Sequence, residues 1–102
     1  MAHLYAIYQQ PADPMAFDKY YYDTHVPLAK KIPGLRSYEV THGDVRGMAG
    51  KHAVYLVATL AFDSMAAIAV AMASPEGQAT AADLANFASA GVDVMMGETR
   101  MV

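Results

Sequence analysis

The stretch HAVYLVATLAF, residues 52–62, is nearly continuously apolar. A short run of this kind is typical of a central strand that is buried on both faces of a sheet. The preceding stretch LRSYEVTHGDV (35–45) predicts a second strand, and RGMAG (46–50) predicts the turn that joins the two. The middle of the chain is therefore expected to form two connected strands.

Two more strands are expected at the ends of the chain, over HLYAIYQ (3–9) and VDVMMGETR (92–100). A breaker-rich segment after the first of them opens a helix over MAFDKYYYDTHVPLAKKI (15–32). A second helical region follows the central strand over MAAIAVAMA (65–73) and restarts at Ser74-Pro75. Either Asp63 or Ser64 can cap its first turn.

The resulting order is β-α-β-β-α-β, which is the ferredoxin-like plan of a four-stranded antiparallel sheet with helices on one face. At 102 residues the chain is expected to be one α+β domain spanning residues 1–102. The composition is 55% hydrophobic and 17% charged, against a typical charged fraction of about 25%. Because helices cover only one face of such a sheet, a second copy is the simplest cover for the other, and we expect a homodimer.

Composition and motifs also argue against several classes of function. The net charge is −3 and the seven basic residues are spread thinly, which argues against a nucleic-acid partner. There is no cysteine, no signal-peptide pattern and no apolar run long enough to span a membrane, so a cytoplasmic location is favoured. Gly-rich phosphate loops and the G-x-S-x-G motif are absent, which argues against nucleotide-dependent chemistry.

The segment YYYDTHVPLAKKIPGL (20–35) holds the main candidates for chemistry. Three- and four-residue spacing places one set of side chains on a single helix face: Phe17, Tyr20, Tyr21, Thr24, His25 and Leu28. Pro27 predicts a kink near His25. An imidazole can act as acid or base near neutral pH, so His25 is the candidate catalytic residue, with Tyr21 as an orienting phenol that also fits a core role.

Tyr8, Tyr38 and Tyr55 come from three different predicted strands and could converge on one face of the sheet. They could line a pocket for an aromatic or polyketide-like ligand, or form an aromatic cluster at a dimer interface, and the sequence leaves both open. A metal site has little support, because His3, His25, His42 and His52 form no i,i+4 pair. No metal or cofactor is therefore expected.

The pattern F-x-x-Y-Y-x-x-x-H-x-P-L followed by I-P-G-L, from Phe17 to Leu35, resembles the EthD family. The opening strand, S-P-E-G at 74–77, Phe87 and the closing V-M-M-G-E also fit. The resemblance implies a ferredoxin-like subunit that pairs into a dimeric α/β barrel. It also implies a link to ethyl tert-butyl ether degradation. In similar barrels a histidine beside the first helix transfers protons, and His25 matches that position. Many EthD-like sequences have a tryptophan where this chain has Tyr20-Tyr21.

These residues and the resemblance predict a cofactor-independent enzyme of isomerase, cyclase or oxygenase type. Its substrate would be a cyclic, aromatic or lactone-like metabolite, with His25 as acid/base. Two alternatives remain. One is a non-catalytic binding or accessory dimer that supports an oxygenase system. The other is a haem-binding barrel with His25 as axial ligand.

Overall fold

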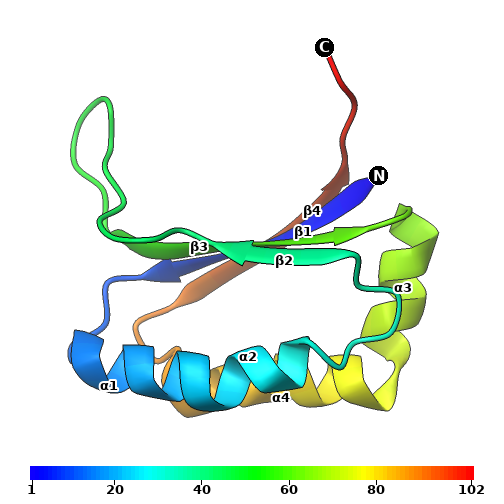
Figure 1. Ribbon diagram of the computed structural model, residues 1–102. Helices are drawn as coiled ribbons and strands as arrows, with labels where there is room; N and C mark the ends of the chain where they lie inside the picture. The colour runs from blue at the N-terminus through cyan, green and yellow to red at the C-terminus, as the bar shows by residue number, and fades with distance from the viewer.

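The computed structural model describes residues 1–102. Its elements are, in order, β1 (Ala2–Gln9), α1 (Pro14–Tyr20), the π-helical turn η1 (Tyr21–His25), α2 (Val26–Ala29), β2 (Ser37–Val40), β3 (Val54–Phe62), α3 (Met65–Ala73), α4 (Pro75–Phe87) and β4 (Val92–Glu98). The predicted β-α-β-β-α-β order is confirmed. The strand expected over residues 35–45 is shorter than predicted, because residues 41–53 leave the sheet as a loop that projects beyond it (Figure 1).

The four strands form one antiparallel sheet in the order β2-β3-β1-β4. In this register Ala6 of β1 lies between Ala58 of β3 and Val94 of β4. The prediction that β3 occupies an interior position is confirmed. Within a single chain β3 is buried mainly on one face, and burial of the other face, as predicted, requires the second copy. Burial alternates along most of β3, with Leu56 and Ala58 buried and Val57 between them half-buried. The cause is that this chain's own helices cover only one face.

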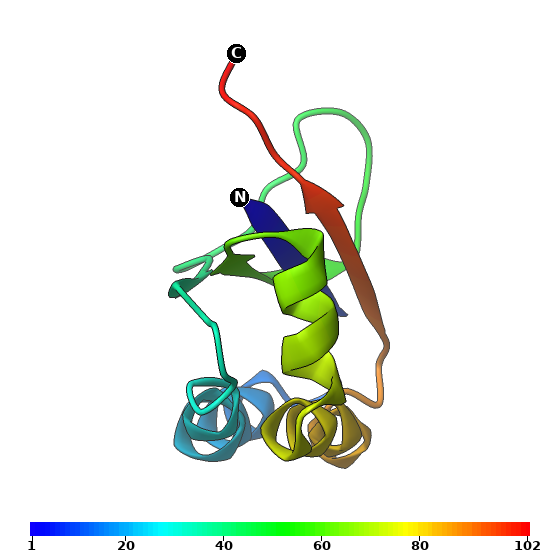
Figure 2. The same cartoon turned by 90° about the vertical axis from the view of Figure 1, so that its right-hand side faces the viewer.

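The helices form a layer beneath the sheet (Figures 1 and 2). The rod α1–η1–α2 and helix α4 lie side by side, and α3 descends from the end of β3 to the start of α4. Ser64 accepts a hydrogen bond from the Ala67 amide, so it is the cap of α3. Ser74 ends α3 and caps α4 by accepting from the Gly77 amide. These short polar side chains set the elbow that brings α4 back under the sheet.

The first helical rod widens into a π-helical turn over Tyr21–His25. Pro27 has no N–H to donate, and the amide of Val26 instead bonds the carbonyl of Tyr21, five residues back. With this wider turn, spacing of four residues keeps side chains on one face, and the buried residues are Phe17, Tyr21, His25 and Ala29. Thr24, expected on this face, is exposed for the same reason.

The opposite face of the sheet carries no helix (Figure 2). Along β1 the residues of that face, His3, Tyr5 and Ile7, are half-buried, while their neighbours on the helix side are buried. The edge strand β4 is more open still, with Met95 50% exposed. No helix of the structure is both long and apolar enough to cross a membrane.

Candidate functional site

A cavity of about 270 Å³ lies between the helix side of the sheet and the helices. Its wall is made of 14 residues, of which 12 are hydrophobic when its two tyrosines are included. Strands supply Leu4, Ala6 and Leu60, and helices supply Ala29 and Leu84. The polar side chains among the lining residues are Tyr8, His25, Tyr38 and Thr80. A small-molecule site usually has this composition, an apolar wall that carries a few polar groups.

His25 enters this cavity from the π-helical turn and is held from behind by Asp83 of α4. The His25 Nδ1 and Asp83 Oδ2 atoms are 2.9 Å apart, and both residues are buried, with exposed fractions of 4% and 6%. The Tyr20 hydroxyl and the Asn86 amide donate to Asp83 Oδ1 at 2.6 and 2.9 Å. Burial opposes the charge of Asp83, but the bonds from Tyr20, Asn86 and His25 outweigh it and lower the pKa of that carboxyl.

The Asp83 carboxylate fixes the state of the imidazole. An ionised carboxylate only accepts, so His25 Nδ1 carries the proton and donates it, which leaves a lone pair on Nε2. Burial lowers the pKa of His25, and the neighbouring Asp83 offsets that effect only in part. His25 is therefore neutral at pH 7. Its Nε2 has no protein partner, and no fully enclosed side-chain nitrogen or oxygen is left unpaired, so Nε2 is open to the cavity.

Tyr8 presents a second unpaired polar atom to the same space. The residue is 1% exposed and lines the cavity, yet its hydroxyl makes no hydrogen bond within the protein. By the same reasoning as for Nε2, that hydroxyl is open to the cavity. Burial raises the pKa of Tyr8, and the nearby Tyr38 and Asp83 raise it further. Tyr8 thus remains a neutral hydrogen-bond donor.

Tyr21, the expected orienting phenol, is fully buried and is not among the cavity-lining residues. Its hydroxyl shares a hydrogen bond of 2.6 Å with the hydroxyl of Tyr38, which does line the cavity. Its ring stacks on His25, with ring centroids 5.6 Å apart. Tyr21 therefore supports two cavity residues, and the phenol that faces the space is Tyr8.

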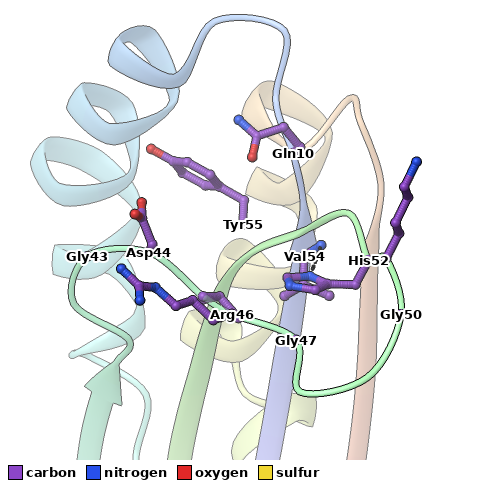
Figure 3. A pocket seen from close by; sticks show the side chains of 11 residues that line it. Gln10, Gly43, Asp44, Arg46, Gly47, Gly50, His52, Val54 and Tyr55 are labelled. Carbon is purple, nitrogen blue, oxygen red and sulfur yellow. Dashed lines mark hydrogen bonds between the residues drawn. The ribbon is translucent and has the colours of Figure 1, made fainter.

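Tyr55 lies elsewhere, in a second hollow of about 720 Å³ beneath the loop of residues 41–53 (Figure 3). Its hydroxyl donates to Asp18 of α1 at 2.8 Å. This hollow is larger than the His25 cavity but open to solvent, and its other polar residues include the exposed side chains of Asp44, Arg46 and His52. No buried polar groups converge there, so the smaller cavity is the better candidate.

The sequence reading missed Asp83, which lies 58 residues from His25. One signal was available in the spacing, because Thr80, Asp83 and Phe87 recur three and four residues apart on a helix. That stripe includes the aromatic Phe87, so an acid within it stood out as a buried charge in need of a partner. No cluster of three or more potential metal ligands forms anywhere in residues 1–102.

Distant solved structures share the fold alone. A mutant form of the oxygenase SnoaB of Streptomyces nogalater, described as cofactor-independent, matches at 16% identity with a TM-score of 0.66, covering 99% of this chain and 94% of its own. A protein from Jannaschia sp. CCS1, described as dimeric and ferredoxin-like, matches at 19% identity with a TM-score of 0.66, covering 97% of this chain and all of its own. The fold is thus one that is found in dimeric ferredoxin-like proteins.

Nearer relatives show the family. An EthD family protein of Bacillus halodurans is 39% identical, with a TM-score of 0.89 over 98% of this chain and 99% of its own. An uncharacterised 11.0 kDa protein from the thcB-thcC intergenic region of Rhodococcus erythropolis is 42% identical over 97 residues, 94% of this chain and 92% of its own. Residues 9–91 match the EthD domain, as the resemblance had predicted. The chain belongs to the EthD domain family.

Proposed function

We propose that this protein is a small cofactor-independent enzyme in which His25 Nε2 moves a proton on a cyclic, aromatic or lactone-like metabolite. The observation that carries the proposal is the buried pair of His25 and Asp83, whose free Nε2 opens into an apolar cavity. A neutral imidazole held in one tautomer by a carboxylate is a general base ready to act at neutral pH. Perturbed titratable groups that converge on a cavity are typical of functional sites.

The proton transfer follows from the positions of these groups. A ligand C–H or O–H next to a carbonyl breaks, its proton bonds to Nε2, and the electron pair moves to the ligand oxygen. Asp83 stabilises the imidazolium that forms, and the Tyr8 hydroxyl donates to the oxygen on which charge develops. Return of the proton to another atom of the ligand completes an isomerisation. In a ring closure, the carbanion instead forms a bond to a second carbonyl carbon of the same ligand, and the oxygen of that carbonyl takes the electron pair and the proton from His25. General acid–base catalysis of this kind contributes about 10²–10⁴-fold in rate.

We also infer that the protein works as a homodimer. The sheet face opposite the helices exposes apolar side chains of β1 and β4, including Ile7 and Met95. A second copy would cover this face with its own equivalent surface, which is the commonest way to bury such a patch. The cavity lies on the other side of the sheet, within one subunit.

The cavity size bears on the haem alternative. At about 270 Å³ the cavity falls below the range of about 300–1,000 Å³ typical of sites for drug-sized ligands, and a porphyrin is larger still. The wall also lacks a Lys or Arg side chain for the propionates of haem. A ligand of one or two rings fits these dimensions better.

The test is α-proton exchange on the neutral bicyclic ketone 2-tetralone in D₂O, followed by NMR. We expect the wild type to accelerate exchange and His25→Gln to lose about 100-fold or more of the enzyme-catalysed rate. His52→Gln is the matched control, because His52 is exposed in the loop hollow, and it should exchange as fast as wild type. Equal rates for wild type and His25→Gln would overturn the catalytic role. Binding of the ketone without acceleration would favour the accessory dimer.

A further inference from the structure

The wall of the His25 cavity holds no positive charge. The chain has seven Lys and Arg residues, and none of them lines this cavity. Two that are engaged pair with surface acids, Lys19 with Asp23 and Arg36 with Asp63. The one titratable base in the wall is His25, which is neutral for the reasons given above. An anion inside the cavity would therefore meet no opposite charge.

A negative charge lies just behind the wall of the cavity. The Asp83 carboxylate is bonded to Nδ1 of the same imidazole whose Nε2 faces the ligand. Placing a second carboxylate on the Nε2 side would oppose two like charges across one ring in an apolar enclosure. Removing an unpaired ion from water is strongly unfavourable even after the surroundings relax. Carboxylate ligands are disfavoured by both effects.

The two polar atoms that are open to the cavity, His25 Nε2 and the Tyr8 hydroxyl, can each bind a complementary, uncharged group of a ligand. Nε2 carries a lone pair and needs a donor, such as a phenol, an enol or an acidic C–H. The Tyr8 hydroxyl has no partner and can donate to a carbonyl or ether oxygen. With a neutral ligand, proton transfer to His25 leaves the total charge of ligand, His25 and Asp83 at −1 throughout. With a carboxylate the same site would hold −2.

We propose that the site selects neutral hydroxylated or enolisable one- or two-ring compounds and rejects carboxylates of the same shape, with Tyr8 and Asp83 as the specificity-determining residues. This inference rests on the cavity named under the proposed function and sharpens its substrate class. Ring acids and carboxylate-bearing lactones are excluded from the proposed substrate class. Phenols, quinols, cyclic ketones and neutral lactones remain in it.

The test compares binding of methyl 4-hydroxybenzoate with binding of 4-hydroxybenzoate at pH 7, by isothermal titration calorimetry. Both share the ring and the phenol and differ in one charge. We expect the wild type to bind the ester at least 10-fold more tightly. The ester is also more apolar than the acid, so a variant is needed to separate the effect of charge on binding from the effect of hydrophobicity. Val94→Lys places a cation at the mouth of the cavity, where Val94 is 48% exposed.

Val94→Lys should lower the preference for the ester by about 10-fold by strengthening carboxylate binding. Val70→Lys is the matched control, because Val70 is 70% exposed on α3 and does not line the cavity, and its preference should equal that of the wild type. Equal affinity of wild type for both compounds, or a preference unmoved by Val94→Lys, would overturn the inference. Calorimetry measures binding directly, so the two proposals can fail separately. A preference for the ester without proton exchange on 2-tetralone would contradict only the proposed catalysis. Exchange together with a preference for carboxylates would defeat the charge inference alone.

Discussion

The two hollows that hold the predicted tyrosines differ in what surrounds them more than in size. The loop hollow is the larger, about 720 Å³ against about 270 Å³, and its charged side chains lie on an exposed loop (Figure 3). The His25 cavity lies between sheet and helices, and its polar groups include the buried side chains of His25 and Tyr8, of which His25 is held by the buried Asp83. A polar group in water is already satisfied, whereas a buried one must be paired or kept for a ligand. Burial therefore makes the smaller cavity the better candidate for a site.

The difference also has an energetic side. Beside the His25 cavity, Asp83 accepts hydrogen bonds from three side chains, so its removal leaves these donors unpaired in a low dielectric. In the loop hollow water replaces a lost partner at little cost. Substitutions in the two places should thus differ by an order of magnitude in their effect on stability.

The largest effect is expected for Asp83→Ala. The substitution leaves the Tyr20 hydroxyl, the His25 Nδ1 proton and the Asn86 amide without their acceptor. We expect the free energy of unfolding to fall by about 3 kcal/mol, because a buried donor left without an acceptor costs about 1–3 kcal/mol and three donors lose theirs here. Urea denaturation measures it. Asp83→Asn keeps an acceptor oxygen and should lose clearly less. A loss below about 1 kcal/mol for Asp83→Ala would mean that the cluster is solvated.

The fold could be predicted from the sequence because its signals are local. The apolar run at 52–62, the caps before α3 and α4 and the proline at 27 each act on nearby backbone, and the element order follows from them. The limits of β2 could not be predicted. The strand signal continues through residues 41–45, and only the pairing with β3 decides that the chain leaves the sheet after Val40.

The site could be predicted only in part, because it is assembled across the fold. Position on one helix face singled out His25, and the structure places it at a cavity. Its partner Asp83 reaches it only when α4 packs beside the first helical rod. Of the three strand tyrosines, Tyr8 and Tyr38 share the cavity, while Tyr55 lies in the other hollow. Strand registers and helix packing decide which tyrosines reach the cavity, and the spacing of residues along the chain reveals neither.

The pH dependence of stability is the second test of the comparison. The pKa of His25 is lowered on folding, so the unfolded state takes up a proton near its ordinary pKa of about 6.5 while the folded state does not. Stability is therefore full above that pH and falls as the pH drops through about 6.5, with a limiting slope of about 1.4 kcal/mol per pH unit. Urea denaturation at several pH values between 5 and 8 measures it.

His25→Gln should flatten the slope in that window, while His52→Gln should keep it, because His52 is exposed in the loop hollow. The Asp83 carboxyl contributes in a separate window. Its pKa is lowered in the folded state, so its contribution is present above about 3.9 and is lost only below that pH. A slope that survives His25→Gln would show that His25 is solvated and titrates normally.

The smallest effect is expected for Lys51→Ala in the loop hollow. Lys51 is exposed and forms no ion pair, so its removal breaks no buried contact. We expect a change of less than about 0.5 kcal/mol in the free energy of unfolding, as for surface substitutions in general. Binding of methyl 4-hydroxybenzoate should also stay within about twofold of wild type, because surface changes away from a site leave its contacts intact. If Lys51→Ala instead weakened binding strongly with stability unchanged, the ligand would occupy the larger, open hollow, and burial of polar groups would have pointed to the wrong one.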